Sequence, residues 1–185
     1  MIKPIVAYGN PVLRKVATEI NPDYPELQDF IKSMYETLAS SNGVGLAAPQ
    51  VGLSIRLFVI DANSFAEDYP EAKGFIKTFI NPEILEETGE EWAFNEGCLS
   101  FPGIFEDVSR KSTVKIKYMD ENFTEHIETY SGICARVVQH EYDHLQGKCF
   151  IDHLSPLKKR MINGKLNNIL KGKAHATYKI KFYKA

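Results

Sequence analysis

Apolar residues recur every three or four positions in several parts of the chain, which is the period of a helix that faces a core. One such run follows Asp23, which can cap a helix that ends in the polar run 40–42. Ser131 can cap another helix, which begins at Gly132 and reaches about residue 146. Two more helices are predicted, a short one over 11–17 behind the cap Asn10 and a last one from Ser155-Pro156 to about Gly172.

Other runs alternate between apolar and polar residues or are continuously apolar, and these predict strands. The predicted strands cover residues 56–60, 78–85, 91–94, 113–119, 124–130 and 178–182, and the polar turn 120–122 predicts a hairpin. Strands and helices come in blocks, so the expected fold class is α+β, with antiparallel or mixed β-sheets packed around a central helix and with a C-terminal helix. The 185 residues are expected to form one domain, in which 158–185 are a basic C-terminal helix and tail.

Charge is distributed unevenly along the chain. The formal net charge is −2, but the first 152 residues carry −11, and the last 33 hold nine basic residues and no acidic one. Such a tail can dock a polyanion such as RNA, and a solvated helix face over an acidic body is the simpler alternative. An apolar fraction of 44% is typical of globular proteins, and no apolar run is long enough for a membrane span. The first residues lack the apolar core of a signal peptide, so the product is expected to stay where it is made.

The strongest chemical signal is the run HEYDH, which begins at His140. Residues four apart on a helix differ by about 40° around its axis, so His140 and His144 project from one side, as a shared cation requires. Glu141 lies close enough to reach a water on that cation without binding the cation itself. Ile133 and Val137 share the histidine side, which indicates that this face is turned inward. The alternative is two ordinary histidines on an amphipathic helix.

Two histidines do not complete a catalytic site, which generally has three protein ligands and one open position. Downstream, His153 lies nine residues after His144, whereas the metzincin pattern places its third histidine six residues on. Upstream, Cys98 follows Gly97 at the end of a predicted strand, where the backbone can approach a ligand closely. Alternatively, Cys98 is a small buried hydrophobic residue, which is also the role expected of Cys134 and Cys149. All three thiols are expected to be reduced.

Three segments together resemble the signature motifs of the peptide deformylase family, in that family's order and spacing. They are GVGLAAPQ at residues 43–50, EGCLS at 96–100 and QHEYDHL at 139–145, and the resemblance extends to about residue 157. It implies a metal held by Cys98, His140 and His144, with water in the fourth position. It also implies removal of the formyl group from nascent polypeptides that begin with formylmethionine. The implied cofactor is one divalent ion, Fe(II) in the cell, with Zn(II), Ni(II) or Co(II) as substitutes.

The same resemblance implies roles for further residues. Glu141 would take the proton of the water and pass one to the leaving nitrogen, while the Gln50 side chain and the Leu99 backbone N–H would stabilise the oxyanion. The residues expected to bind substrate are Val44, Gly45 and Gly97 through their backbone, and Val44, Ile133 and Val137 around the methionine side chain. The chain departs from the family at two positions: Phe101 stands in place of an aliphatic residue, and Phe105 in place of an arginine near the pocket rim. Arg110 matches a second arginine of that region.

Other functions and partners follow from the same residues. An H-E-x-x-H endopeptidase with another third ligand would cleave internal peptide bonds instead of releasing formate. A non-catalytic metal-bearing or peptide-binding module is disfavoured, because a structural zinc site has four protein ligands and three are found. For the tail, the resemblance implies docking to the ribosome or its RNA through Lys158–Lys173, because bacterial relatives use their C-terminal helix this way. Neither a membrane nor DNA is expected as a partner, and the expected location is the cytoplasm.

Overall fold

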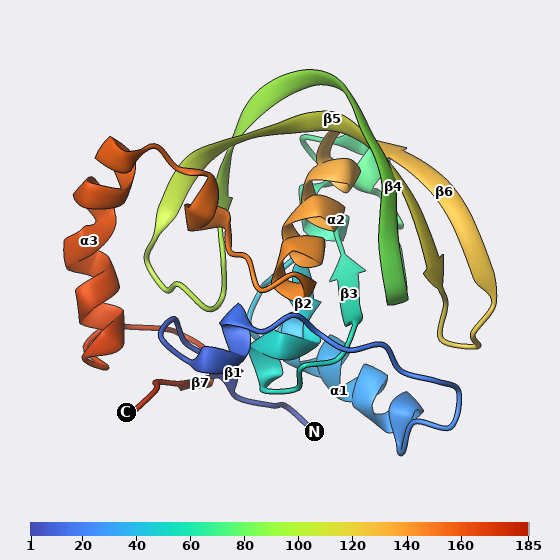
Figure 1. Cartoon of the computed structure of the whole chain (residues 1–185), viewed down its shortest axis with the longest axis horizontal. Helices are drawn as coiled ribbons and strands as arrows, with labels where there is room; N and C mark the ends of the chain where they lie inside the picture. Colours follow the sequence, from blue (N-terminus) through green and yellow to red (C-terminus); the bar gives the residue numbers. More distant parts are fainter. Residues whose placement is uncertain (185) are drawn as a thin grey trace.

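The computed structural model describes residues 1–184, in which a strongly bent antiparallel sheet arches over a central helix (Figure 1). The strand order in this five-stranded sheet is β2-β3-β4-β5-β6. The strands are β2 (Gly45–Ala47), β3 (Leu57–Asp61), β4 (Ile76–Gly97), β5 (Phe105–Met119) and β6 (Glu125–Ser131). A separate two-stranded sheet joins the ends of the chain, where β1 (Ile5–Val6) and β7 (Ile180–Lys181) pair in parallel.

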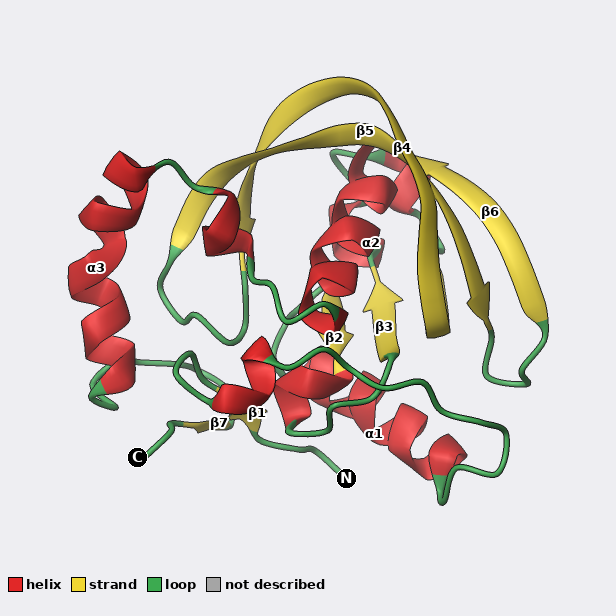
Figure 2. Cartoon of the chain, in the orientation of Figure 1, coloured by secondary structure: helices red, strands yellow, loops and turns green. Residues whose placement is uncertain are grey.

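Three α-helices and several 3-10 turns accompany the strands: α1 (Leu27–Ser40), α2 (Gly132–Leu145) and α3 (Pro156–Leu170). Figure 2 shows α2 beneath the arch of β4, β5 and β6, and it contacts β2, β3, β5 and β6. The α+β class, with antiparallel and mixed sheets around a central helix and with a C-terminal helix, is confirmed. Among the described residues, no helix combines the length and the apolar character needed to cross a membrane.

The two strands predicted over 78–85 and 91–94 form one strand of 22 residues, β4. The prediction of a break was wrong because residues 86–91 are exposed and include no apolar side chain, so no buried face marks them as a strand. The register between β4 and β5 shifts after Ile80, Ile84 and Thr88. Such bulges bend a strand and increase its twist, and they allow this long hairpin to curve over α2.

Two of the predicted helix caps were wrong. Asp23 does not start α1, since Pro25 disfavours helical backbone at the residue before it, and the helix begins at Leu27. Ser131 precedes α2 as predicted, but its hydroxyl lies 3.2 Å from that of Thr113 and does not cap the helix. Glu71 lies at this helix end instead, where it accepts a 3.4 Å hydrogen bond from the N–H of Ile133. The short helix predicted over 11–17 is a single 3-10 turn, Pro11–Arg14, capped by Asn10 as expected.

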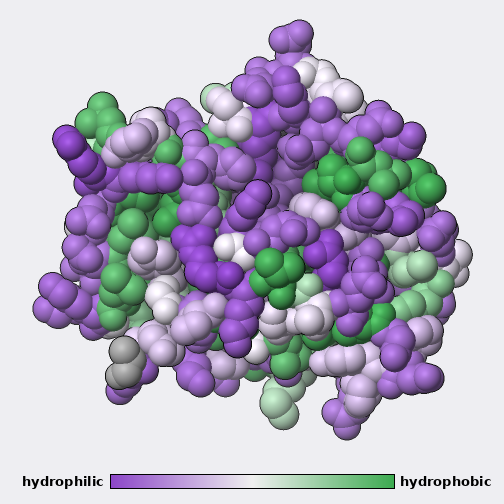
Figure 3. All heavy atoms as spheres, viewed as in Figure 1, coloured by the Kyte–Doolittle hydropathy of each residue, from purple (hydrophilic) through white to green (hydrophobic). Residues whose placement is uncertain are grey.

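α3 lies at the outer side of the molecule, next to the hairpin end of β4 and β5 (Figure 1). It begins behind Ser155, whose side chain accepts a hydrogen bond from the N–H of Lys158 as the sequence predicts. Ile162, Leu166 and Ile169 are buried with Phe101 and Phe150 in one hydrophobic cluster, which we call the α3 cluster. Figure 3 shows a largely hydrophilic face with hydrophobic patches, one of them at the left, where α3 lies.

Candidate metal centre

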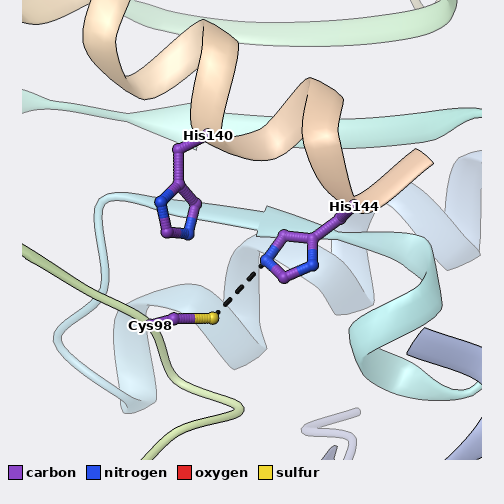
Figure 4. A group of neighbouring side chains, drawn as sticks. All are labelled: Cys98, His140 and His144. Atoms are coloured by element: carbon purple, nitrogen blue, oxygen red, sulfur yellow. Dashed lines mark hydrogen bonds between the residues drawn. The ribbon is translucent and has the colours of Figure 1, made fainter. Parts of the chain in front are cut away.

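Cys98, His140 and His144 come together beneath the arch, with their side chains pointing toward one another (Figure 4). Cys98 is the first residue after β4 and begins the hairpin loop to β5, whereas both histidines lie on α2. One ligand atom from each residue lies within 4.8 Å of the other two. The Cys98 Sγ lies 3.4 Å from His144 Nε2. The structure therefore brings a thiol from a loop to the two imidazoles that the helical spacing had placed on one side.

The orientation of both imidazole rings fits a metal ion. His140 Nδ1 lies 2.7 Å from Glu96 Oε1, which leaves Nε2 as the nitrogen available to the cluster. Burial lowers the pKa of His144 to about 3, so this ring is neutral and its Nε2 can donate an electron pair. One sulfur and two imidazole nitrogens are a donor set that suits Fe(II) or Zn(II), not Mg(II) or Ca(II). The residues present therefore fit Fe(II) or Zn(II).

Glu96, near the end of β4, connects the metal cluster to two buried arginines. Its carboxylate accepts hydrogen bonds from His140 and Arg110, the latter at 2.8 and 3.0 Å, and from Arg136 at 2.9 Å. Burial by itself would raise the pKa of Glu96, but these hydrogen bonds from His140 and Arg110 outweigh it and hold the pKa well below its ordinary value. Glu96 is thus a permanent anion that fixes the His140 ring.

Arg110 and Arg136 are themselves held by further groups. Arg110 donates to Asp143 at 2.8 Å, and Arg136 donates to the backbone carbonyls of Val108 and Trp92. Both guanidinium groups are buried, with Arg110 only 6% exposed. The family resemblance matched Arg110 to a second arginine of the pocket-rim region. Arg110 does not line the cleft and belongs instead to an ion-pair network that joins β4, β5 and α2.

Glu141 is buried beside the cluster and packs directly on Gly45. A Cβ atom at Gly45 would lie 2.4 Å from Glu141 Oε1, so no other residue at that position leaves the carboxylate in place. The second oxygen, Oε2, is buried and has no hydrogen-bond partner among the described residues. Burial raises the pKa of Glu141 to about 7. A carboxyl group of this kind can exchange a proton near neutral pH with a polar molecule in the cleft.

Gln50 and Leu99 lie next to the thiol of the cluster. Gln50 belongs to a 3-10 helix (Ala48–Val51), and its Oε1 accepts a 2.9 Å hydrogen bond from the N–H of Ala47. Its Nε2 is thereby directed to Cys98 Sγ, at 3.4 Å, and to Ser100 Oγ, at 3.3 Å. In the described part of the chain, no hydrogen bond uses the N–H of Leu99. Two N–H donors therefore lie next to the thiol, and the one of Leu99 has no partner among the described residues.

A cleft of about 530 Å³ opens over these groups. It is lined by most of the residues expected from the sequence: Val44, Gly45, Gln50, Gly97, Cys98, Leu99, Val137, His140 and Glu141. Ile133, by contrast, is fully buried in the hydrophobic core between α2 and the sheet, one helical turn before Val137. Phe101 also lines the cleft but is only 1% exposed, because it packs against Tyr8 and Phe150.

The cleft borders an unpaired strand edge. β2 is the outer strand of the sheet, so one side of its backbone can pair with an added strand. On the other side, a Cβ at Gly97 would lie 2.4 Å from the ring of Phe105, which covers this residue. Phe105 is 65% exposed and forms an apolar rim at the position where the family resemblance implies an arginine.

Comparisons with known proteins agree with this geometry. The model of the family described as polypeptide deformylase matches residues 2–160. A peptide deformylase from Flavobacterium johnsoniae is 57% identical over 98% of this chain and 96% of its own. The corresponding protein from Christiangramia forsetii is 56% identical with the same coverage. A crystal structure of a peptide deformylase from Legionella pneumophila superposes with a TM-score of 0.81 at 38% identity, covering 94% of this chain and 98% of that one.

The chain belongs to the peptide deformylase family. It is therefore a metal-dependent hydrolase that removes the N-terminal formyl group from the formylmethionine of newly synthesised polypeptides and releases formate. This deformylase identity decides against an endopeptidase and against a non-catalytic binding module, both of which the residues alone left open.

The ion-pair network of Glu96, Arg110, Arg136 and Asp143 next to the deformylase site was not predicted from the sequence. Arg136 precedes His140 by four residues and His144 by eight, so all three share one side of α2. An arginine on the inward side of a helix needs a buried anion. The spacing of Arg136 could therefore have predicted a buried carboxylate near the histidines, which the structure shows to be Glu96. Arg110 gave no such signal, because its burial depends on how β5 crosses α2.

Replacing Glu96 by glutamine tests this network. Glu96→Gln keeps the shape of the side chain but leaves Arg136 without its carboxylate and Arg110 with Asp143 alone. We expect the free energy of unfolding to fall by about 3 kcal/mol, because a buried charge loses its partner. Urea unfolding of the metal-free chain measures this, with Glu91→Gln as the control, since Glu91 pairs with Lys111 on the surface at 3.7 Å. Equal stability of the two variants would contradict the network.

Proposed function

We propose that Cys98, His140 and His144 hold the divalent ion of this deformylase, and that the ion is Fe(II) in the cell. The observation that carries the proposal is the convergence of one sulfur and two ring nitrogens within 4.8 Å at the base of the cleft. When bound, such an ion supplies a Lewis acid and lowers the pKa of a water from 15.7 to about 7. A neutral His144 and a His140 ring fixed by Glu96 are prepared for this ion before it binds.

The other groups around the cluster divide the work of amide hydrolysis. Glu141 accepts the proton of the attacking water and delivers a proton to the departing nitrogen. Its unpartnered Oε2 and its confinement by Gly45 support this role. Gln50 Nε2 and the Leu99 N–H donate to the oxygen of the formyl group as negative charge develops on it. Each donor of this kind is worth about 2.7–4 kcal/mol in other hydrolases.

Substrate recognition is proposed to rest on the backbone, because nascent chains differ after their first residue. The peptide would add as a strand between the free edge of β2, at Val44 and Gly45, and Gly97. The methionine side chain would lie against Val44 and Val137. Ile133 would contribute from the layer behind Val137, where it is buried.

Replacing Glu141 by alanine tests the proton-transfer role. Glu141→Ala is expected to keep its metal, since Glu141 is not one of the proposed ligands, and to lose activity by about 10²–10⁴-fold. Formate release from a formyl-methionyl tripeptide measures this, with the exposed Glu90→Ala on β4 as the matched control. The internal peptide bonds of the substrate should stay intact in every sample. Wild-type activity in Glu141→Ala would refute the assigned role.

Replacing Cys98 tests the ligand set and the identity of the ion. Protein prepared without oxygen is expected to contain one iron per chain, and Cys98→Ala is expected to lose it, because a site of three ligands becomes one of two. Cys134→Ala removes a thiol that lies outside the cluster and should keep the metal. Elemental analysis of the three proteins gives the result. Full iron content in Cys98→Ala would show that the thiol does not bind the ion.

We further propose that this enzyme works in the cytoplasm and that α3 docks it on ribosomal RNA. Leu157 and Met161 are 64% and 73% exposed on this helix, next to the exposed basic residues Lys159 and Arg160. Lys158 is less free, because it lies 3.5 Å from Glu106. A basic helix face beside exposed apolar side chains fits an RNA surface with a protein neighbour, and its affinity should fall with salt.

Charge reversal on α3 tests the docking proposal. Lys159→Glu/Arg160→Glu is expected to weaken sedimentation with ribosomes roughly tenfold at low salt, because two phosphate contacts are lost. Substitution is preferable to truncation, since removal of the residues after Ser155 would also remove β7, which pairs with β1. The control, Lys15→Glu/Lys32→Glu, reverses two exposed charges near the N-terminus. Equal sedimentation of the two double variants would reject docking through α3.

A further inference from the structure

The hairpin loop that carries Cys98 and Leu99 is held by segments from both ends of the chain. Three successive carbonyl oxygens of this loop each accept one hydrogen bond. The carbonyl of Cys98 accepts from the N–H of Phe101 at 2.8 Å, that of Leu99 from the hydroxyl of Tyr178 at 2.7 Å, and that of Ser100 from the N–H of Tyr8 at 2.8 Å. Tyr8 lies just after β1 and Tyr178 just before β7, so the two terminal strands flank the loop.

These bonds fix the direction of the Leu99 N–H. That N–H lies in the same rigid peptide plane as the Cys98 carbonyl, and the Leu99 carbonyl lies in the next plane. With both planes held, the backbone on either side of the Leu99 Cα has little freedom to rotate. A donor to a developing oxyanion is effective only when it already points to the right place, because reorienting it during the reaction costs energy.

Tyr178 is itself anchored in the C-terminal segment. The N–H groups of Ile5 and Ala7 donate to the carbonyls of Lys179 and Lys181, at 2.9 and 3.0 Å. Ile180 and Phe182 pack against the α3 cluster. Burial raises the pKa of Tyr178 to about 12, so its hydroxyl keeps the proton that it donates.

The segment that carries Tyr178 also forms part of the cleft. Residues 175–178 line it together with Cys98, His140 and Leu99. This segment lies outside residues 2–160, the part of the chain that the family model matches. The C-terminal tail therefore contributes a side chain and a wall to a site whose candidate metal ligands and N–H donors come from the family motifs.

We propose that Tyr178 is a positioning residue for deformylation. Its hydroxyl holds the Leu99 carbonyl and thereby aims the Leu99 N–H at the oxygen of the formyl group. The inference rests on the role of the Leu99 N–H in the proposed function. A merely structural role for Tyr178 has a different signature: a loosened tail would alter the wall at 175–178 and change peptide binding, whereas a misdirected donor changes the transition state alone.

Tyr178→Phe removes the hydroxyl and keeps the ring. For a formyl-methionyl tripeptide we expect kcat to fall roughly tenfold, less than on complete loss of a donor, with KM changed less than about twofold. Tyr183→Phe is the matched control, since Tyr183 is a tail tyrosine that is 40% exposed, and it should keep the wild-type kcat. In the metal-free protein, the amide hydrogens of Phe101 and Tyr8 should exchange roughly tenfold faster in Tyr178→Phe, because their acceptors lie in the loosened loop.

The outcomes separate this inference from the chemistry on which it rests. A wild-type kcat in Tyr178→Phe, or a loss carried by KM alone, overturns the positioning role. Unchanged exchange of both amide hydrogens also overturns it. Glu141→Ala is assayed alongside: if it is inactive while Tyr178→Phe keeps the wild-type kcat, the proton transfer by Glu141 stands and the positioning of the Leu99 N–H by Tyr178 is rejected, whereas an active Glu141→Ala rejects the proposed chemistry itself.

Discussion

The candidate metal centre depends on the carboxylate of Glu96, which is 4% exposed and shared by two arginines and a histidine. A buried anion is costly unless cations and hydrogen bonds compensate for it, and here Arg110 comes from β5 while Arg136 comes from α2. The same carboxylate therefore links the sheet to the helix and sets the His140 ring. Cys98 stands two residues after Glu96, so the anchor that orients the imidazole also places the thiol.

Close approach of backbone to side chain is the second constraint on the site. β2 runs so near to α2 that the Glu141 carboxylate rests on Gly45, and the Leu99 side chain lies similarly against Gly43, where a Cβ would be 2.8 Å from its nearest atom. The glycine-rich segment thus brings an unpaired strand edge next to Glu141, the carboxylate proposed to transfer protons. Substrate backbone and reacting bond can then occupy one cleft without any side chain between them.

Local patterns in the sequence predicted the extents of α2 and α3 and the hairpin over 113–130, because each has a regular apolar period. The end signals were less reliable, since Ser131 does not cap α2 and β5 begins at Phe105 instead of residue 113. Local patterns failed where tertiary contacts decide the structure. The middle of β4 carries no apolar pattern, and its strand conformation depends on pairing with β5. The spacing of His140 and His144 predicted a shared cation, but Cys98 could be added only through resemblance to a family, since periodicity cannot bring a loop to a helix. Glu96 and Tyr178 act through contacts of 44 and 79 residues' separation, which no local pattern encodes.

X-ray absorption spectroscopy of the zinc-loaded chain is the sharpest test of the proposed ligands, because it reports the atoms bound to the ion without reference to activity. The convergence of Cys98, His140 and His144 predicts one sulfur at about 2.3 Å and two imidazole nitrogens at about 2.0–2.1 Å, with a light atom in the remaining position. A spectrum without a sulfur neighbour, or with more than one, would contradict the ligand set on which the account of this enzyme is built.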